Sequence, residues 1–170
     1  FDLLDQEKTD EIELGSYTLS GVMMTLSSLD GDLNQTSDSF GINHNGGSLD
    51  ESAQIDGDNG DETLKFSFNT SGTLDLLSFS HFGPSDTLTL KKGTTTILNL
   101  ADLGISDVFS VGVTFTASDE FFLTFDESSF VGAGVSLNNI QITTIPEPSS
   151  FLLLGFGGLT LLSRRKRPAT

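Results

Sequence analysis

The sequence contains no cysteine, which excludes a disulfide framework, a thiolate metal site and a cysteine nucleophile. Tryptophan is absent too, and Tyr17 is the single tyrosine. Carbohydrate-binding modules commonly stack sugars on exposed tryptophan and tyrosine rings, so this shortage weighs against sugar binding. The two histidines, His44 and His81, belong to no His-Glu-x-x-His motif or similar metal constellation. We expect His81 to lie on the surface at the end of a strand.

Basic residues are scarce and unevenly placed. The chain has eight of them against 24 acids, and four of the eight stand together at Arg164, Arg165, Lys166 and Arg167. Residues 1–163 therefore carry four lysines against 24 acids, a net charge of −20, within a total of −16. Nucleic-acid affinity comes largely from lysines and arginines that neutralise phosphates. We therefore expect no nucleic-acid binding.

Local signatures of catalysis are also missing. The sequence has no Gly-x-Ser-x-Gly elbow and no Walker loop, which are common signals for acyl transfer and nucleotide binding. Paired acids such as Asp119 and Glu120 are compatible with glycoside hydrolysis, which needs two carboxyl groups at a suitable separation. With 24 acids in the chain, solvated charged turns explain such pairs better. We expect no enzyme activity and assign no catalytic residue.

Apolar and polar residues alternate between residues 16 and 145, and helical periodicity is absent there. A period of two predicts strands that bury one face. The longest strict alternation has as its apolar members Phe109, Val111, Val113 and Phe115. We therefore predict an all-β domain at residues 16–145, a two-sheet β-sandwich of jelly-roll type, with a barrel as the alternative. Residues 1–15 form an N-terminal lead-in.

Two pairs of strand-like runs predict hairpins. The run at residues 64–68 precedes another at 74–79, and the run at 86–91 precedes another at 94–100 after a short link ending at Gly93. Residues 29–62 are instead rich in aspartate, asparagine, glycine and serine. This composition predicts loops with one or two edge strands.

An acidic loop at residues 56–62 is a candidate Ca²⁺ site, because Ca²⁺ accepts roughly six to eight oxygen ligands in flexible geometry. The candidate ligands are Asp56, Asp58, Asp61 and Glu62. Counted from Asp56, the loop lacks the glycine and the glutamate that an EF-hand has at its sixth and twelfth positions. A solvated turn is the favoured interpretation, so no metal or other cofactor is assigned.

After residue 145 the composition changes abruptly. Pro146, Glu147 and Pro148 precede an uncharged apolar run at residues 151–163, which the basic cluster at 164–167 follows. The prolines interrupt regular structure and mark the end of the domain. A helix over the apolar run spans only ~20 Å, less than the ~30 Å hydrocarbon core of a bilayer. The basic cluster nevertheless favours a membrane segment, because such charges snorkel and are retained on the cytoplasmic side.

This order of Pro-Glu-Pro, short apolar helix and basic cluster resembles the PEP-CTERM sorting domain of Gram-negative bacteria. The resemblance covers residues 145–167 and identifies residues 146–170 as a sorting tail. It implies that Pro146, Glu147 and Pro148 are the recognition motif, residues 151–163 the transient membrane helix, and residues 164–167 the stop-transfer cluster. It also implies cleavage by a membrane-embedded exosortase. Residues 1–5 have no signal-peptide character, so we expect an export signal to have been removed or to lie outside this sequence.

Together these features predict a non-catalytic exported protein, inserted in the membrane as a precursor and then located at the cell surface or in the extracellular matrix. An exosortase-type enzyme is its expected partner, and the resemblance associates it with biofilm and extracellular polysaccharide. A Ca²⁺-dependent carbohydrate-binding or adhesive module is the alternative. A secreted glycoside hydrolase is a more distant one.

Overall fold

A computed structural model of the chain describes residues 1–4, 14–36, 39–43, 54–56, 61–82, 86–101, 107–125 and 134–145. Its strands are β1 (Leu14–Leu19), β2 (Val22–Ser28), β3 (Asp32–Gln35), β4 (Phe40–Asn43), β5 (Ile55–Asp56), β6 (Thr63–Phe68), β7 (Gly72–Ser80), β8 (Thr87–Lys92), β9 (Thr95–Ala101), β10 (Val108–Phe115), β11 (Glu120–Phe125) and β12 (Gly134–Thr144). The described residues contain no helix, which confirms an all-β domain. The expected C-terminal helix and the whole segment 146–170 lie outside the described residues.

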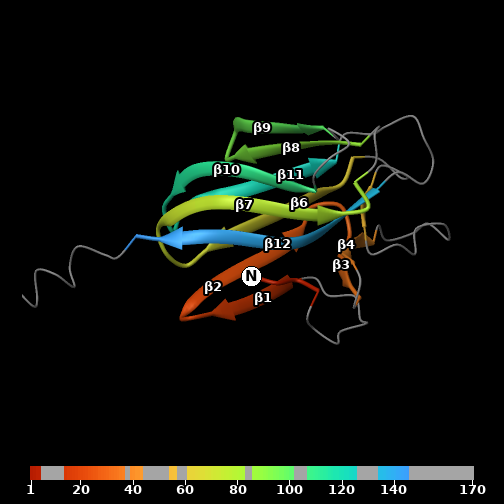
Figure 1. Ribbon diagram of the computed structural model, residues 1–170. Helices are drawn as coiled ribbons and strands as arrows, with labels where there is room; N and C mark the ends of the chain where they lie inside the picture. The colour runs from red at the N-terminus through yellow and green to blue at the C-terminus, as the bar shows by residue number, and fades with distance from the viewer. Residues whose placement is uncertain are drawn as a thin grey trace, which may run out of the picture.

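Two antiparallel sheets form a sandwich, as predicted (Figure 1). One has the strand order β1-β2-β6-β11-β8-β9 and the other β10-β7-β12-β5, while β3 and β4 form a separate two-stranded sheet. Strands β5 to β12 divide four and four between the two large sheets. Their order, β5-β12-β7-β10 and β6-β11-β8-β9, is the paired Greek-key arrangement of a jelly roll.

Alternate residues of both sheets meet in one apolar core. Strand β6 shows the pattern most clearly, because Leu64, Phe66 and Phe68 are buried while the residues between them are half-buried. Phe66 stacks on Phe121 of the same sheet with ring centroids 5.0 Å apart. Phe68 stacks on Phe115 of the opposite sheet at 4.8 Å. The Phe68–Phe115 contact joins the two layers, so the apolar residues of the period-two pattern form the inward face of the strands.

The two predicted hairpins have different outcomes. Strands β8 and β9 do pair, through a two-residue turn in which Gly93 has φ +56°, a value that suits the primed turns of hairpins. The predicted pairing of residues 64–68 with 74–79 is wrong. Strand β6 pairs with β2 and β11, and β7 pairs with β10 and β12, so the chain crosses between sheets at residues 69–71.

Residues 1–4 extend the sheet beside β12. Asp2 forms a bridge with Asn139, the Leu3 amide donates to the Asn138 carbonyl at 2.9 Å, and Leu3 is fully buried. The first part of the segment predicted as a lead-in is thus packed on the domain. Within residues 29–62, where we expected one or two edge strands, the described parts form the three short strands β3, β4 and β5.

The turns of the sandwich gather at two opposite ends. The β1–β2, β6–β7, β8–β9 and β10–β11 turns lie at one end together with the last residues of β12, and we call it the tail end (Figure 1). Backbone hydrogen bonds join these turns: Asn69 donates to Met23, Ile145 to Ser71, and Gly93 to Glu120, at 3.0, 3.0 and 2.9 Å. The opposite end, where β6, β8, β10 and β12 begin, is the far end.

Candidate functional site

The acidic loop predicted as a candidate Ca²⁺ site lies at the far end, between β5 and β6. Asp56 and Glu62 are buried there, and the Asp56 amide donates to Glu62 Oε2 at 2.9 Å. Asp61 is exposed, and Asp58 lies outside the described residues. Within the part of the chain that the structure describes, no three His, Cys, Asp or Glu side chains are grouped so that they could hold a metal ion.

Hydrogen bonds at the loop connect it to its neighbours. The Glu62 carbonyl accepts from the Phe125 amide at 2.9 Å, and Asp30 Oδ2 accepts from the Thr63 amide at 2.9 Å. The buried carboxylate of Glu62 thus fixes the β5 end of the loop through the Asp56 amide, and its backbone fixes β11. These contacts give the acids a structural role in closing the far end.

The acidic pair Asp119 and Glu120 lies at the tail end, where the turn after β10 meets the first residue of β11. Asp119 Oδ2 accepts from the Thr116 amide at 2.8 Å, which, together with Lys92 at 3.5 Å, holds the pKa of that carboxyl below its usual value. Glu120 forms an ion pair with Lys65 at 2.8 Å. Each carboxylate therefore has a cation of its own, and the pair acts as a charged turn.

Aromatic side chains of the described residues mostly face inward. Tyr17 is buried, and its hydroxyl donates to Gln35 Oε1 at 3.1 Å. Burial raises the pKa of Tyr17 to about 12. The only tyrosine is thus part of the core and offers no platform for a sugar ring. Phe82, which follows β7, is half-buried against Phe79 and Phe109.

His81 is exposed directly after β7, which confirms its expected place on the surface. Its φ of +61° is in the left-handed region that non-glycine residues seldom adopt. The His81 Nδ1 lies 3.3 Å from the hydroxyl of Ser80. The same hydroxyl donates to Asn138 Oδ1 at 3.0 Å, so the geometry among the described residues favours a strand-ending turn.

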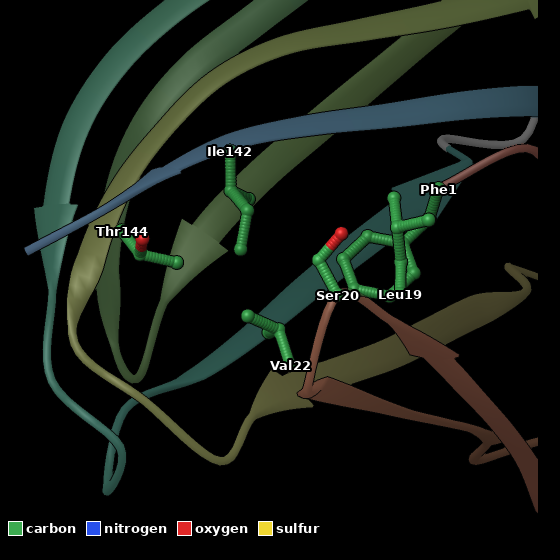
Figure 2. A pocket seen from close by; sticks show the side chains of 6 residues that line it. All are labelled: Phe1, Leu19, Ser20, Val22, Ile142 and Thr144. Atoms are coloured by element: carbon green, nitrogen blue, oxygen red, sulfur yellow. The ribbon is translucent and has the colours of Figure 1, made fainter.

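A small apolar groove opens beside the point where β12 ends. Six residues line a space of about 260 Å³, and four of them are apolar: Phe1, Leu19, Val22 and Ile142. Figure 2 shows these side chains, with Ser20 and Thr144, around the common space between the β1–β2 turn and β12. Sequence reasoning missed this groove. The available signal was Leu19, which continues the inward face of β1 past the last core residue.

The described residues also end at this place. Ile145 donates its amide to the Ser71 carbonyl at 3.0 Å, and its side chain is 49% exposed. The next residue is Pro146, which has no amide hydrogen and cannot extend the ladder of β12. The change in composition therefore comes directly after a residue that is still hydrogen-bonded to the rest of the sandwich. Among the described residues, no helix has the length and apolar character needed to cross a membrane.

Residues 144–167 match the family described as the PEP-CTERM protein-sorting motif. The match begins at the last residue of β12 and contains Pro146, Glu147, Pro148, the apolar run and the basic cluster. It confirms the resemblance stated for the tail. No curated protein and no solved structure matches the chain. The family match covers the tail and does not extend to the rest of the sandwich.

Proposed function

We propose that this chain, which carries a PEP-CTERM protein-sorting motif, is a non-catalytic exported protein whose sandwich is delivered to the cell surface or extracellular matrix by exosortase processing. The observation that carries the proposal is the match at residues 144–167, which begins at the last residue of β12. Cleavage at or beyond Pro146 would leave all the described strands in the released chain.

Each part of the tail has a separate physical role. The run at residues 151–163 has no charge and holds the precursor in the bilayer, although as a helix it spans only ~20 Å. The cluster at 164–167 keeps the C-terminus on the cytoplasmic side, because each such charge costs roughly 2.5–3.5 kcal/mol at the centre of an inserted helix. Export of the chain therefore stops at the tail, which stays inserted with its C-terminus on the cytoplasmic side.

The Pro-Glu-Pro segment lies between the domain and the membrane run. Its two prolines fix φ and disfavour helix, and an extended segment of this kind would suit binding by a processing enzyme. Glu147 is the only charged residue between Ile145 and the basic cluster, and it gives that enzyme a specific contact. Cleavage near this segment would release or transfer the sandwich.

The role of the sandwich is association with the matrix, including biofilm exopolysaccharide. Its net acidity keeps it soluble outside the cell, and the buried Tyr17 supports a role other than stacking of sugars. A Ca²⁺-dependent adhesive or carbohydrate-binding module is the second candidate, and its ligands would come from the acidic loop that carries Asp56, Asp61 and Glu62. A glycan array with and without chelator separates the two. New reducing ends after incubation with polysaccharide would indicate a glycoside hydrolase.

Substitution of the recognition motif in the native host tests the proposal. We expect Pro146→Ala, Glu147→Ala and Pro148→Ala together to trap an uncleaved, membrane-associated form, because the processing enzyme loses its recognition residues. The matched control replaces Ser149 and Ser150 with alanine and should be processed normally. Membrane fractionation with immunoblotting measures both. Normal release of the triple variant would contradict the proposal.

A further inference from the structure

Charge is segregated between the two ends of the sandwich. The far end includes Asp30, Asp56, Asp61, Glu62, Asp86 and Asp107 among its described residues. The described part of the chain has lysines only at positions 65, 91 and 92. Two of these lysines neutralise acids of the tail end, since Lys65 pairs with Glu120 at 2.8 Å and Lys92 with Asp119 at 3.5 Å. Asp75, near the start of β7, accepts from the Thr143 hydroxyl at 2.8 Å and adds one acid to this end, while Lys91 adds one lysine. The tail end is therefore close to neutral, and the far end is strongly acidic.

Exposed apolar side chains accompany this neutral end. Leu19 is 55% exposed, Met23 41% and Ile145 49%. The turns that carry them are joined by hydrogen bonds, because Asn69 Oδ1 accepts from the Met23 amide at 2.7 Å and the Ser71 carbonyl accepts from Ile145. The apolar groove of Figure 2 lies between Leu19 and β12. We call Leu19, Met23, Ile145 and the groove the tail face.

The chain length beyond the sandwich places the tail face near the lipid. Residues 146–150 join Ile145 to the apolar run, and at ~3.3–3.6 Å per residue they separate the two by about 20 Å at most. The far end lies the length of β12 further away, about 35 Å for 11 residues. The Debye length at physiological salt is ~8 Å, so acids at that distance are screened from anionic headgroups.

We propose that the tail face contacts the lipid surface in the membrane-inserted precursor, with Leu19 and Met23 at the headgroup layer and the acidic far end directed away from the membrane. This inference rests on the proposed function, because the tail must first be inserted. Lipid is the favoured partner on two grounds. The face is joined to the membrane run by a linker of about 20 Å at most, and the acids of the tail end are balanced in number by its lysines, so anionic headgroups repel this end less than the far end.

The absence of cysteine allows a direct test, because each introduced thiol is the only one in the chain. Four single variants of the full chain, Leu19→Cys, Met23→Cys, Leu29→Cys and Val108→Cys, carry an environment-sensitive fluorophore. Leu29 and Val108 are matched controls, since they are 59% and 49% exposed and lie at the far end. A fifth variant, Leu161→Cys, reports on insertion of the tail. The probe is vesicles of phosphatidylethanolamine and phosphatidylglycerol with brominated acyl chains, which quench nearby fluorophores.

We expect labels at positions 19 and 23 to be quenched roughly twofold or more relative to labels at 29 and 108, with the label at 161 quenched most strongly. Equal quenching at both ends, or none at either, while position 161 is quenched, would overturn the tail-face proposal alone. An unquenched position 161 would overturn the membrane role of the tail and this inference with it. Protection of the label at position 23 from solvent in native membranes but not in lipid vesicles would show that a protein covers the tail face. That result would contradict the lipid proposal.

Discussion

Tyr17 shows how a single buried polar group is accommodated in the core. Its hydroxyl donates to Gln35, and the Gln35 amide donates to the Leu3 carbonyl, so three segments far apart in the sequence share one hydrogen-bonded chain. All three residues are buried. A buried polar group that lost its partner would cost about 1–3 kcal/mol, so these residues depend on one another.

The ionisation of Tyr17 reports on this environment. Burial disfavours the phenolate. We therefore expect the pKa of Tyr17 to be raised from 10 to about 12 in the folded protein. Because the pKa of Tyr17 is raised in the folded state, its contribution to the free energy of unfolding is fully present below pH 10. That contribution is lost as the pH rises towards 12. Ultraviolet absorbance of tyrosinate, measured in buffer and in concentrated urea, separates the two states.

The chain has one tyrosine and no tryptophan, so the absorbance signal belongs to Tyr17 alone. The variant Tyr17→Phe should abolish the signal, which controls for its origin. The same titration midpoint with and without urea would show that Tyr17 is not buried in the folded state.

At the scale of elements, β10 illustrates how an edge strand is shaped. It lies at the edge of its sheet, and its pairing with β7 shifts between Ser110 and Val113. Gly112 lies inside this irregularity and has φ +69°, a backbone angle that residues other than glycine adopt only at a cost in free energy. Such a bulge twists the edge and hinders pairing with another chain.

Gly112 provides a clean test, because no atom lies within 4 Å of where its Cβ would be. We expect Gly112→Ala to lower the free energy of unfolding by about 1–2 kcal/mol through backbone strain alone. Gly112→Asn should lower it less, because asparagine tolerates this conformation. Urea unfolding measures both, with Ser110→Ala as the exposed control on the same strand. Equal stability of the Ala and Asn variants would contradict a left-handed Gly112.

Strand identity was predictable from the sequence, but the pairing of strands was only partly so. The alternation at Phe109 to Phe115 and the turn at Gly93 are local patterns, and both led to correct elements. The turn before Gly72 looks equally local. There the chain crosses between sheets, and a Cβ at Gly72 would collide with the Thr143 carbonyl of β12. A turn can join two neighbouring strands of one sheet or two strands in opposite sheets. Which of the two occurs depends on strands far away in the sequence, so the residues of the turn do not predict it.

At the scale of the whole molecule, the excess of acids determines the response to ions. Residues 1–163 carry four lysines against 24 acids, a net charge of −20, and the far-end acids repel one another. We expect added sodium chloride to raise the melting temperature by screening this repulsion. Calcium at the same ionic strength should add no further shift, because Glu62 and Asp30 already accept backbone hydrogen bonds.

Differential scanning calorimetry at matched ionic strength measures this response. A ligand that prefers the native state raises its melting temperature, so a shift specific to Ca²⁺ would support the adhesive alternative. The variant Asp61→Asn removes one exposed candidate ligand of the acidic loop, so it tests whether such a shift comes from that loop. Loss of a Ca²⁺-specific shift in that variant would contradict the solvated-turn interpretation.

The two candidate sites also differ in how far the sequence predicted them. The sorting tail is a linear pattern, and Pro146, Glu147 and the basic cluster stand in one short stretch, so the sequence alone sufficed. The tail face combines Leu19, Met23 and Ile145 from three separate strands and turns. No local pattern unites these residues, and only the folded sandwich places them at one end.

The measurement that tests the central claim most directly is mass spectrometry of the C-terminal peptide of the protein recovered from the surface of its native host. The account predicts a chain that ends near Pro146, Glu147 and Pro148 and lacks the apolar run and the basic cluster. Recovery of surface protein with an intact terminus from Arg164 to Thr170 would contradict it.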